Sequence, residues 1–167
     1  LGGKMKFKNF IKIFFAILFV FVSTNSYAKT IKWSMQGDSL TLDPHAQNEG
    51  PTTQVSRQVY EALVTRGLDM SIEPQLATDW KTTDPNTWIF NLRKDVKFSD
   101  GSNMTAKDVV FSILRAKQPT SDFKEYISTI SDVKEIDNYT EQISTRKPNP
   151  ILLNQLSNIF IMSKKWS

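Results

Sequence analysis

The segment Glu49-Gly50-Pro51-Thr52 is the candidate ligand-binding stretch of the sequence. It stands at the predicted start of a helix, where free backbone N–H groups and the helix dipole favour a carboxylate or another anion. Gly50 would let a ligand come close to the backbone, because it has no side chain. The alternative is that Thr52 or Thr53 caps the helix and Glu49 is a solvated loop acid. The residues alone leave both interpretations open.

The sequence offers few groups for catalysis or metal binding. His45 is the single histidine and cysteine is absent, so a His-based metal site and a nucleophile–base pair both lack a second member. We expect His45 to be a loop histidine with a structural or solvent role. Acidic residues fall at turns, helix starts and alternating positions, which is typical of a solvated surface. We therefore expect no cofactor, no metal and no enzymatic activity, and we keep a hydrolase with paired carboxylates as an alternative.

The basic charge of the chain is concentrated at its start. The sequence has 21 Lys and Arg residues against 17 Asp and Glu residues. Residues 1–28 hold four lysines and no acid, so the remainder carries 17 basic and 17 acidic residues. A formally neutral remainder argues against a nucleic-acid partner.

Residues 5–28 have the three parts of a secretory signal peptide. Basic residues precede an apolar run from Ile13 to Val22, and Ser26-Tyr27-Ala28 supplies small residues before a cleavage site after Ala28. Ten apolar residues are too few to span a hydrocarbon core of about 30 Å, which disfavours a membrane anchor. The sequence predicts an exported, periplasmic protein. Residues 1–4 precede Met5 and are predicted to be an untranslated leader.

The region from Thr87 to Lys117 has the clearest local pattern. Large apolar residues alternate in 88–92, which predicts a strand, and Asp100-Gly101 predicts a turn. Thr105 and Asp108 form a capping box for a helix with one apolar stripe. Phe111 lies in the polar arc of that helix, so we expect another part of the protein to cover it.

This region resembles a signature of the family 5 extracellular solute-binding proteins, the periplasmic peptide-binding components of ABC importers. Members of that family carry strings of the type tW-F-LRk-vkFsDG-p-tA-DVvfS. The matching residues are Trp88, Phe90, Leu92, Arg93, Val96, Phe98, Asp100, Gly101, Thr105, Ala106, Asp108, Val109, Val110, Phe111 and Ser112.

The other elements agree with this resemblance in order. Residues 31–35 are predicted to form a strand, and residues 53–65 a helix that ends near Gly67. Two extended segments, 130–136 and 139–145, predict a hairpin. Asn149-Pro150 predicts a further helix start.

The resemblance implies an α+β (mixed α/β) fold with a largely antiparallel sheet and helices on one face. It implies a periplasmic-binding-protein-like, class II (cluster C) two-lobe protein of which only the N-terminal part is present. Residues 29–50 would be the first strand and loop of the main lobe. Residues 51–167 would be mostly a smaller subdomain of the N-terminal lobe, truncated before the second lobe.

The implied function is a monomeric receptor that closes on a peptide and presents it to the inner-membrane permease subunits of an ABC transporter. By similarity, Glu49, Gly50, Pro51 and Thr52 would lie near the peptide. Related proteins that bind nickel chelates or oligosaccharides give an alternative solute class. A structural or chaperone-like periplasmic module is a third possibility.

Overall fold

The computed structural model of the protein describes residues 30, 32 and 34–166. The predicted leader, the signal peptide and the cleavage site after Ala28 lie outside these residues. The chain divides into two compact units, residues 1–34 and 35–167, and the description below concerns the second. In the described part of the chain, no helix is long and apolar enough to cross a membrane.

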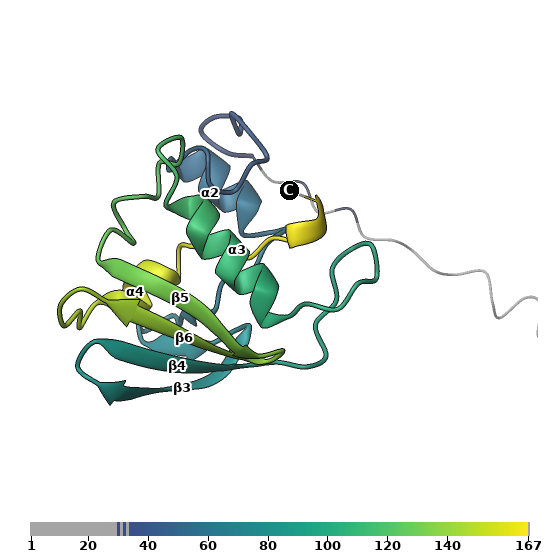
Figure 1. Ribbon diagram of the computed structural model, residues 1–167. Coiled ribbons are helices and arrows are strands. Elements are labelled where there is room, and N and C mark those ends of the chain that lie inside the picture. Colours follow the sequence, from purple (N-terminus) through teal and green to yellow (C-terminus); the bar gives the residue numbers. More distant parts are fainter. Residues whose placement is uncertain (1–29, 31, 33, 167) are drawn as a thin grey trace, which may run out of the picture. The chain divides into compact units, whose positions relative to one another are not determined.

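The main sheet has four antiparallel strands in the order β3-β4-β6-β5 (Figure 1). Its strands are β3 (Ala77–Asp84), β4 (Thr87–Leu92), β5 (Ile130–Asp137) and β6 (Thr140–Thr145). Phe90 and Leu92 on β4 are buried, as the predicted alternation requires. The predicted hairpin is confirmed as β5 and β6.

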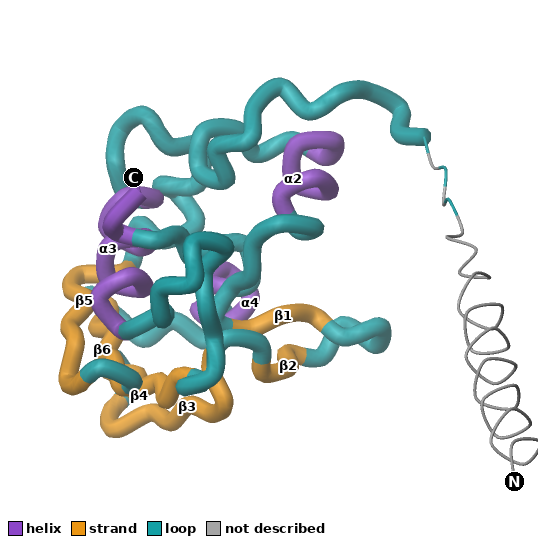
Figure 2. Tube along the Cα trace, turned by 90° about the vertical axis from the view of Figure 1, so that its right-hand side faces the viewer, coloured by secondary structure: helices purple, strands orange, loops and turns teal. Residues whose placement is uncertain are grey.

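Helix α3 (Ala106–Ala116) lies on one face of this sheet and packs against β5 and β6 (Figure 2). Asp108 starts it as predicted: its Oδ2 accepts the Thr105 N–H at 2.9 Å. Ala106, Val109 and Ile113 are fully buried against the sheet. The turn before the helix is also confirmed, because Gly101 has a φ of 83°, where a side chain would be strained.

The polar side of α3 is buried as well, which sequence patterning did not predict. Asp108 and Ser112 are 8% and 0% exposed. Asp108 Oδ1 accepts the Lys164 N–H at 2.9 Å, and Ser112 Oγ accepts the Met162 N–H at 2.8 Å. These two side chains are buried because they satisfy backbone donors of an irregular segment that has no strand partner there.

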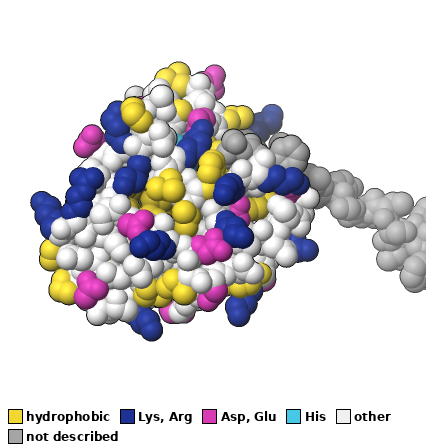
Figure 3. Space-filling model, viewed as in Figure 1, with side chains coloured by type: hydrophobic (Ala, Val, Ile, Leu, Met, Phe, Trp, Pro, Cys, Tyr) yellow, Lys and Arg dark blue, Asp and Glu magenta, His cyan; other side chains and the backbone are white. Residues whose placement is uncertain are grey.

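The outer surface of α3 carries a shallow apolar hollow of about 410 Å³. Val110, Phe111 and Leu114 line it, and Leu114 is 45% exposed although its spacing predicted a core position. The buried stripe is formed by Ala106, Val109, Ile113 and Ala116, while Val110 is only partly buried beside it. Figure 3 shows hydrophobic side chains gathered on this face with basic groups around them. The cover expected over Phe111 stays a prediction.

The helix predicted over residues 53–65 is wrong in its second half. Helix α2 (Gly50–Ser56) is short, and Val64–Arg66 forms strand β1, paired with β2 (Ile72–Pro74). Backbone pairing overrides the helical spacing: the Leu76 and Ala77 N–H groups donate to the Ala62 and Leu63 carbonyls at 3.1 and 2.9 Å. Gly67 therefore lies in the β1–β2 turn and does not end a helix.

Two further predicted elements differ from the structure. Residues 34 and 35 are not in a strand, and two of the residues predicted to form it, Ile31 and Trp33, lie outside the described residues. The last α-helix, α4, spans Leu152–Leu156 and is followed by the 3-10 helix η1 (Lys164–Trp166). The N-cap residue of α4 is Ile151, two residues later than predicted, although Asn149 Oδ1 accepts the Ile151 N–H at 3.2 Å and Asn149 Nδ2 donates to Thr129 and Gln155.

Glu141 also departs from the expected surface pattern of acids. It lies on β6 two residues before the core residue Ile143, so the strand periodicity turns both inward, and Glu141 is 0% exposed. Neither carboxyl oxygen has a hydrogen-bond partner among the described residues. Burial raises the pKa of Glu141 well above 4.5. The carboxyl group is therefore neutral in the fold over a wider pH range than in the unfolded chain.

We expect Glu141→Met to stabilise the full-length protein by about 1–3 kcal/mol, because it removes a buried polar group without a partner. Above pH 4.5 the unfolded state loses the Glu141 proton while the folded state keeps it, so this residue destabilises more as pH rises. The gain should therefore be larger at pH 7 than at pH 4 in denaturant unfolding.

The matched control is Glu135→Met, because Glu135 pairs with Glu141 across the sheet but is exposed. This variant should change stability by less than about 0.5 kcal/mol. Equal effects of the two substitutions would contradict the assignment of Glu141 as a buried, unpaired acid.

Candidate ligand-binding loop

The predicted site residues lie where a loop enters α2. Glu49 is the N-cap residue, and Pro51 occupies the first turn. Thr52 is 1% exposed; its hydroxyl donates to Glu49 Oε1 at 2.8 Å and accepts the Leu40 N–H at 3.2 Å. The structure thus brings Glu49 and Thr52 together. The alternative interpretation expected a threonine side-chain cap, but α2 has no side-chain cap hydrogen bond. It also expected Glu49 to be a solvated loop acid, but Glu49 is half-buried and bonded to Thr52.

Gly50 is exposed, and a Cβ atom added there would meet no other atom within 4 Å. The open space leaves room for a ligand beside the backbone. Pro51 is half-buried and lies near Gly37. Of the four residues, Glu49, Gly50 and Pro51 therefore present surface, whereas Thr52 holds the loop from inside. Their role in binding stays a prediction.

An ion pair joins the loop before α2 to helix α3. Arg115 NH1 donates to Asp43 Oδ1 at 2.8 Å and NH2 donates to Oδ2 at 2.7 Å. Such a two-point geometry fixes the relative orientation of both groups. The hydrogen bond from Arg115 is the largest cause that lowers the pKa of Asp43, and Asp43 in turn raises the pKa of Arg115.

His45 continues this network into the core. Its Nδ1 lies 3.2 Å from Arg115 NH1 and its Nε2 lies 2.9 Å from the Phe160 carbonyl oxygen. Because a guanidinium can only donate, Nδ1 must accept and Nε2 must carry the proton. Burial, together with the Arg115 charge, lowers the pKa of His45 to about 4. His45 is 1% exposed, so the structural role predicted for it is the one observed.

The segment after α3 supports the same loop. Ser121 Oγ donates to the His45 carbonyl at 2.9 Å, and the His45 ring packs edge-on against Phe123. Asn48 Nδ2 donates to the Tyr126 hydroxyl at 3.2 Å. Sequence reasoning missed Asp43, Arg115 and Ser121. The available signals were the Leu-Asp-Pro-His run and an arginine on the polar side of a capped helix.

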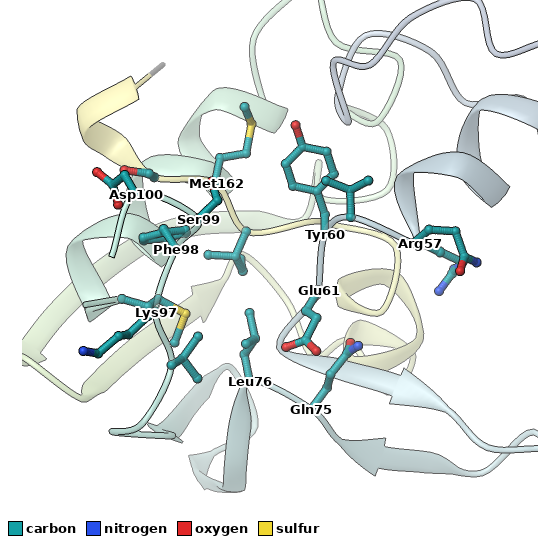
Figure 4. Close-up of a pocket in the computed structure, with 16 residues that line it drawn as sticks. Arg57, Tyr60, Glu61, Gln75, Leu76, Lys97, Phe98, Ser99, Asp100 and Met162 are labelled. Atoms are coloured by element: carbon teal, nitrogen blue, oxygen red, sulfur yellow. The ribbon is translucent and has the colours of Figure 1, made fainter. Parts of the chain in front are cut away.

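A second concave region includes Tyr60, whose hydroxyl donates to the Leu42 carbonyl of the loop at 3.4 Å. It has a volume of about 570 Å³, and Figure 4 shows Tyr60, Glu61 and Gln75 on one side and Phe98 and Asp100 on the other. Its lining includes residues of both charges and aromatic rings, but none of Glu49 to Thr52. The described residues contain no group of three or more metal-ligating side chains at either place.

Comparison with known proteins identifies the family. The sequence model described as "Bacterial extracellular solute-binding proteins, family 5 Middle" matches residues 71–167. This chain belongs to that family. The resemblance predicted from residues 87–117 is thereby confirmed.

Individual relatives agree. The periplasmic oligopeptide-binding protein OppA of Escherichia coli (strain K12) is 33% identical in an alignment of 129 residues that covers 66% of this chain and 24% of OppA. The solved structure of the Escherichia coli murein tripeptide binding protein MppA has 29% identity and a TM-score of 0.74, over 78% of this chain and 30% of MppA. MoaA of A. tumefaciens R10, solved with mannopinic acid, has 36% identity and a TM-score of 0.71, over 77% and 28%.

These similarities confirm the predicted fold class, a mixed α/β periplasmic-binding-protein fold. The chain spans about a quarter of the length of OppA. The assignment of residues 29–50 to the main lobe and of residues 51–167 mostly to a smaller subdomain stays a prediction.

We expect the pH dependence of stability to report on His45. Above pH 6.5 both folded and unfolded states hold His45 neutral; below it only the unfolded state takes up the proton, until about pH 4. His45 therefore costs about 3 kcal/mol of stability as pH falls from 6.5 to 4. Urea unfolding of the full-length protein measures the free energy of unfolding at each pH. In the His45→Gln variant, this free energy should no longer fall by the His45 contribution between pH 6.5 and 4. An identical pH slope in wild type and variant would contradict it.

Proposed function

We propose that this protein is the solute-binding component of an ABC importer and that it captures peptides in the periplasm. The observation that carries the proposal is membership of the family 5 solute-binding proteins together with 33% identity to an oligopeptide-binding protein. The predicted signal peptide supports a periplasmic location. We propose that the protein is a monomer and that it docks on the permease subunits of the transporter.

The proposed mechanism is ligand-driven closure. A peptide that contacts two lobes binds the closed form better than the open form, and it shifts the equilibrium by that difference in affinity. The loop through Glu49 and Gly50 would supply a fixed part of the binding surface. The protein would have no chemical step to perform, because the groups described above hold structure and form no nucleophile–base pair.

A non-peptide solute is the second candidate. MoaA, which is 36% identical over 77% of this chain, was solved in complex with mannopinic acid, a solute that is not a peptide.

A thermal-shift panel on the full-length protein tests the proposal. Di-, tri- and tetra-alanine, mannopinic acid and a nickel–histidine chelate would be added at matched concentrations. A ligand at one hundred times its Kd should stabilise the folded protein by about 2.7 kcal/mol. We expect the peptides to raise Tm, and mass spectrometry to recover them uncleaved.

A rise in Tm with mannopinic acid or the chelate alone would replace peptides by the second candidate. Cleavage of the peptides would overturn the assignment as a receptor. No shift with any member of the panel would contradict the proposed solute classes.

A further inference from the structure

The loop from Leu40 to Asn48 has no regular secondary structure, so side chains must fix its position. Its carbonyl and amide groups make long backbone bonds, such as Ala46 N–H to Asp43 O at 3.4 Å and Asp122 N–H to His45 O at 3.3 Å. Bonds of this length hold a backbone weakly. Glu49 and Gly50, the candidate site residues, follow directly after this loop.

Arg115 contributes the strongest contacts to the loop. Its NH1 donates to Asp43 Oδ1 and His45 Nδ1, and its NH2 donates to Asp43 Oδ2, at distances of 2.7–3.2 Å. The guanidinium is half-buried, so water screens these bonds only in part. Its backbone lies in the last turn of α3, which is itself packed on the sheet.

His45, which also accepts a hydrogen bond from Arg115, adds a second connection. It links the loop to Phe160 through Nε2, and its carbonyl accepts from Ser121. Both connections end on parts of the chain far from the loop in sequence, and neither uses Glu49 or Gly50. Their removal would therefore loosen the middle of the loop, which would keep its bonds from Leu40 to Thr52 and from Asn48 to Tyr126, and would leave Glu49 and Gly50 chemically unchanged.

We propose that Arg115 and His45 are positioning residues for the solute: they set the place of Glu49 and Gly50 without touching the ligand. The expected effect of these residues on solute binding rests on the proposed function. Their expected effect on the position of the loop does not. Arg115 acts through Asp43, and His45 acts through the Phe160 carbonyl.

The test compares Arg115→Gln and Arg115→Lys in the full-length protein. Loss of charge-assisted hydrogen bonds should weaken the Kd for trialanine about tenfold or more in Arg115→Gln. Arg115→Lys keeps the charge without the two-point geometry, so it should recover part of the affinity. Isothermal titration calorimetry measures both, and unchanged circular dichroism shows that the variants fold.

The matched control is Arg93→Gln. Arg93 also makes a two-point contact, to Asp95, but this exposed pair joins neighbouring residues on the surface. The control should bind trialanine like wild type. A folded Arg115→Gln variant with the wild-type Kd would overturn the proposal.

Hydrogen exchange of the ligand-free protein separates this inference from the proposed function. Amides of residues 40–50 should exchange faster in Arg115→Gln than in wild type or Arg93→Gln, whether or not peptides bind. Unchanged exchange in these residues would overturn the positioning role. Faster exchange in a protein that binds no peptide would support the positioning role and contradict the peptide function.

Discussion

A single polar stripe on α3 holds the irregular part of the protein to the regular part. Asp108, Ser112 and Arg115 are spaced four and three residues apart and so lie along one side of the helix. They bind the Lys164 amide, the Met162 amide and the Asp43 carboxylate in turn. The opposite side of α3 packs on the sheet, so the helix is the shared support for the sheet, the last segment and the candidate binding loop.

Elements with a local cause could be predicted from the sequence. The Asp100-Gly101 turn, the Thr105 start of α3 and the β5–β6 hairpin each depend on side chains that contact their own neighbours in the chain. The spacing of Asp108, Ser112 and Arg115 predicts that they lie opposite the apolar side of the helix, but it does not reveal the Lys164 and Met162 amides or the Asp43 carboxylate that they bind. Periodicity identifies a polar face but not what covers it.

The same limit explains the errors at α2 and Glu141. The apolar spacing after Ser56 fits a helix, yet Ala62 and Leu63 pair with the chain before β3 and take an extended form. Glu141 obeys the strand period that buries Ile143, which places an acid in the core without a partner. For the candidate site, the sequence located Glu49 and Gly50, whereas the side chains that hold them, Asp43 and Arg115, are 72 residues apart and meet only in the fold.

The central claim is that the backbone at the start of α2 contacts the solute. Gly50→Val tests it directly, because a Cβ atom added at Gly50 meets no other atom of the protein within 4 Å. The measurement is the Kd of the full-length variant for trialanine by titration calorimetry, beside its Tm. We expect the Tm to change by only a few degrees. The Kd should rise about tenfold or more, because the valine side chain would occupy the space of the ligand. Wild-type affinity in Gly50→Val would contradict contact at this point.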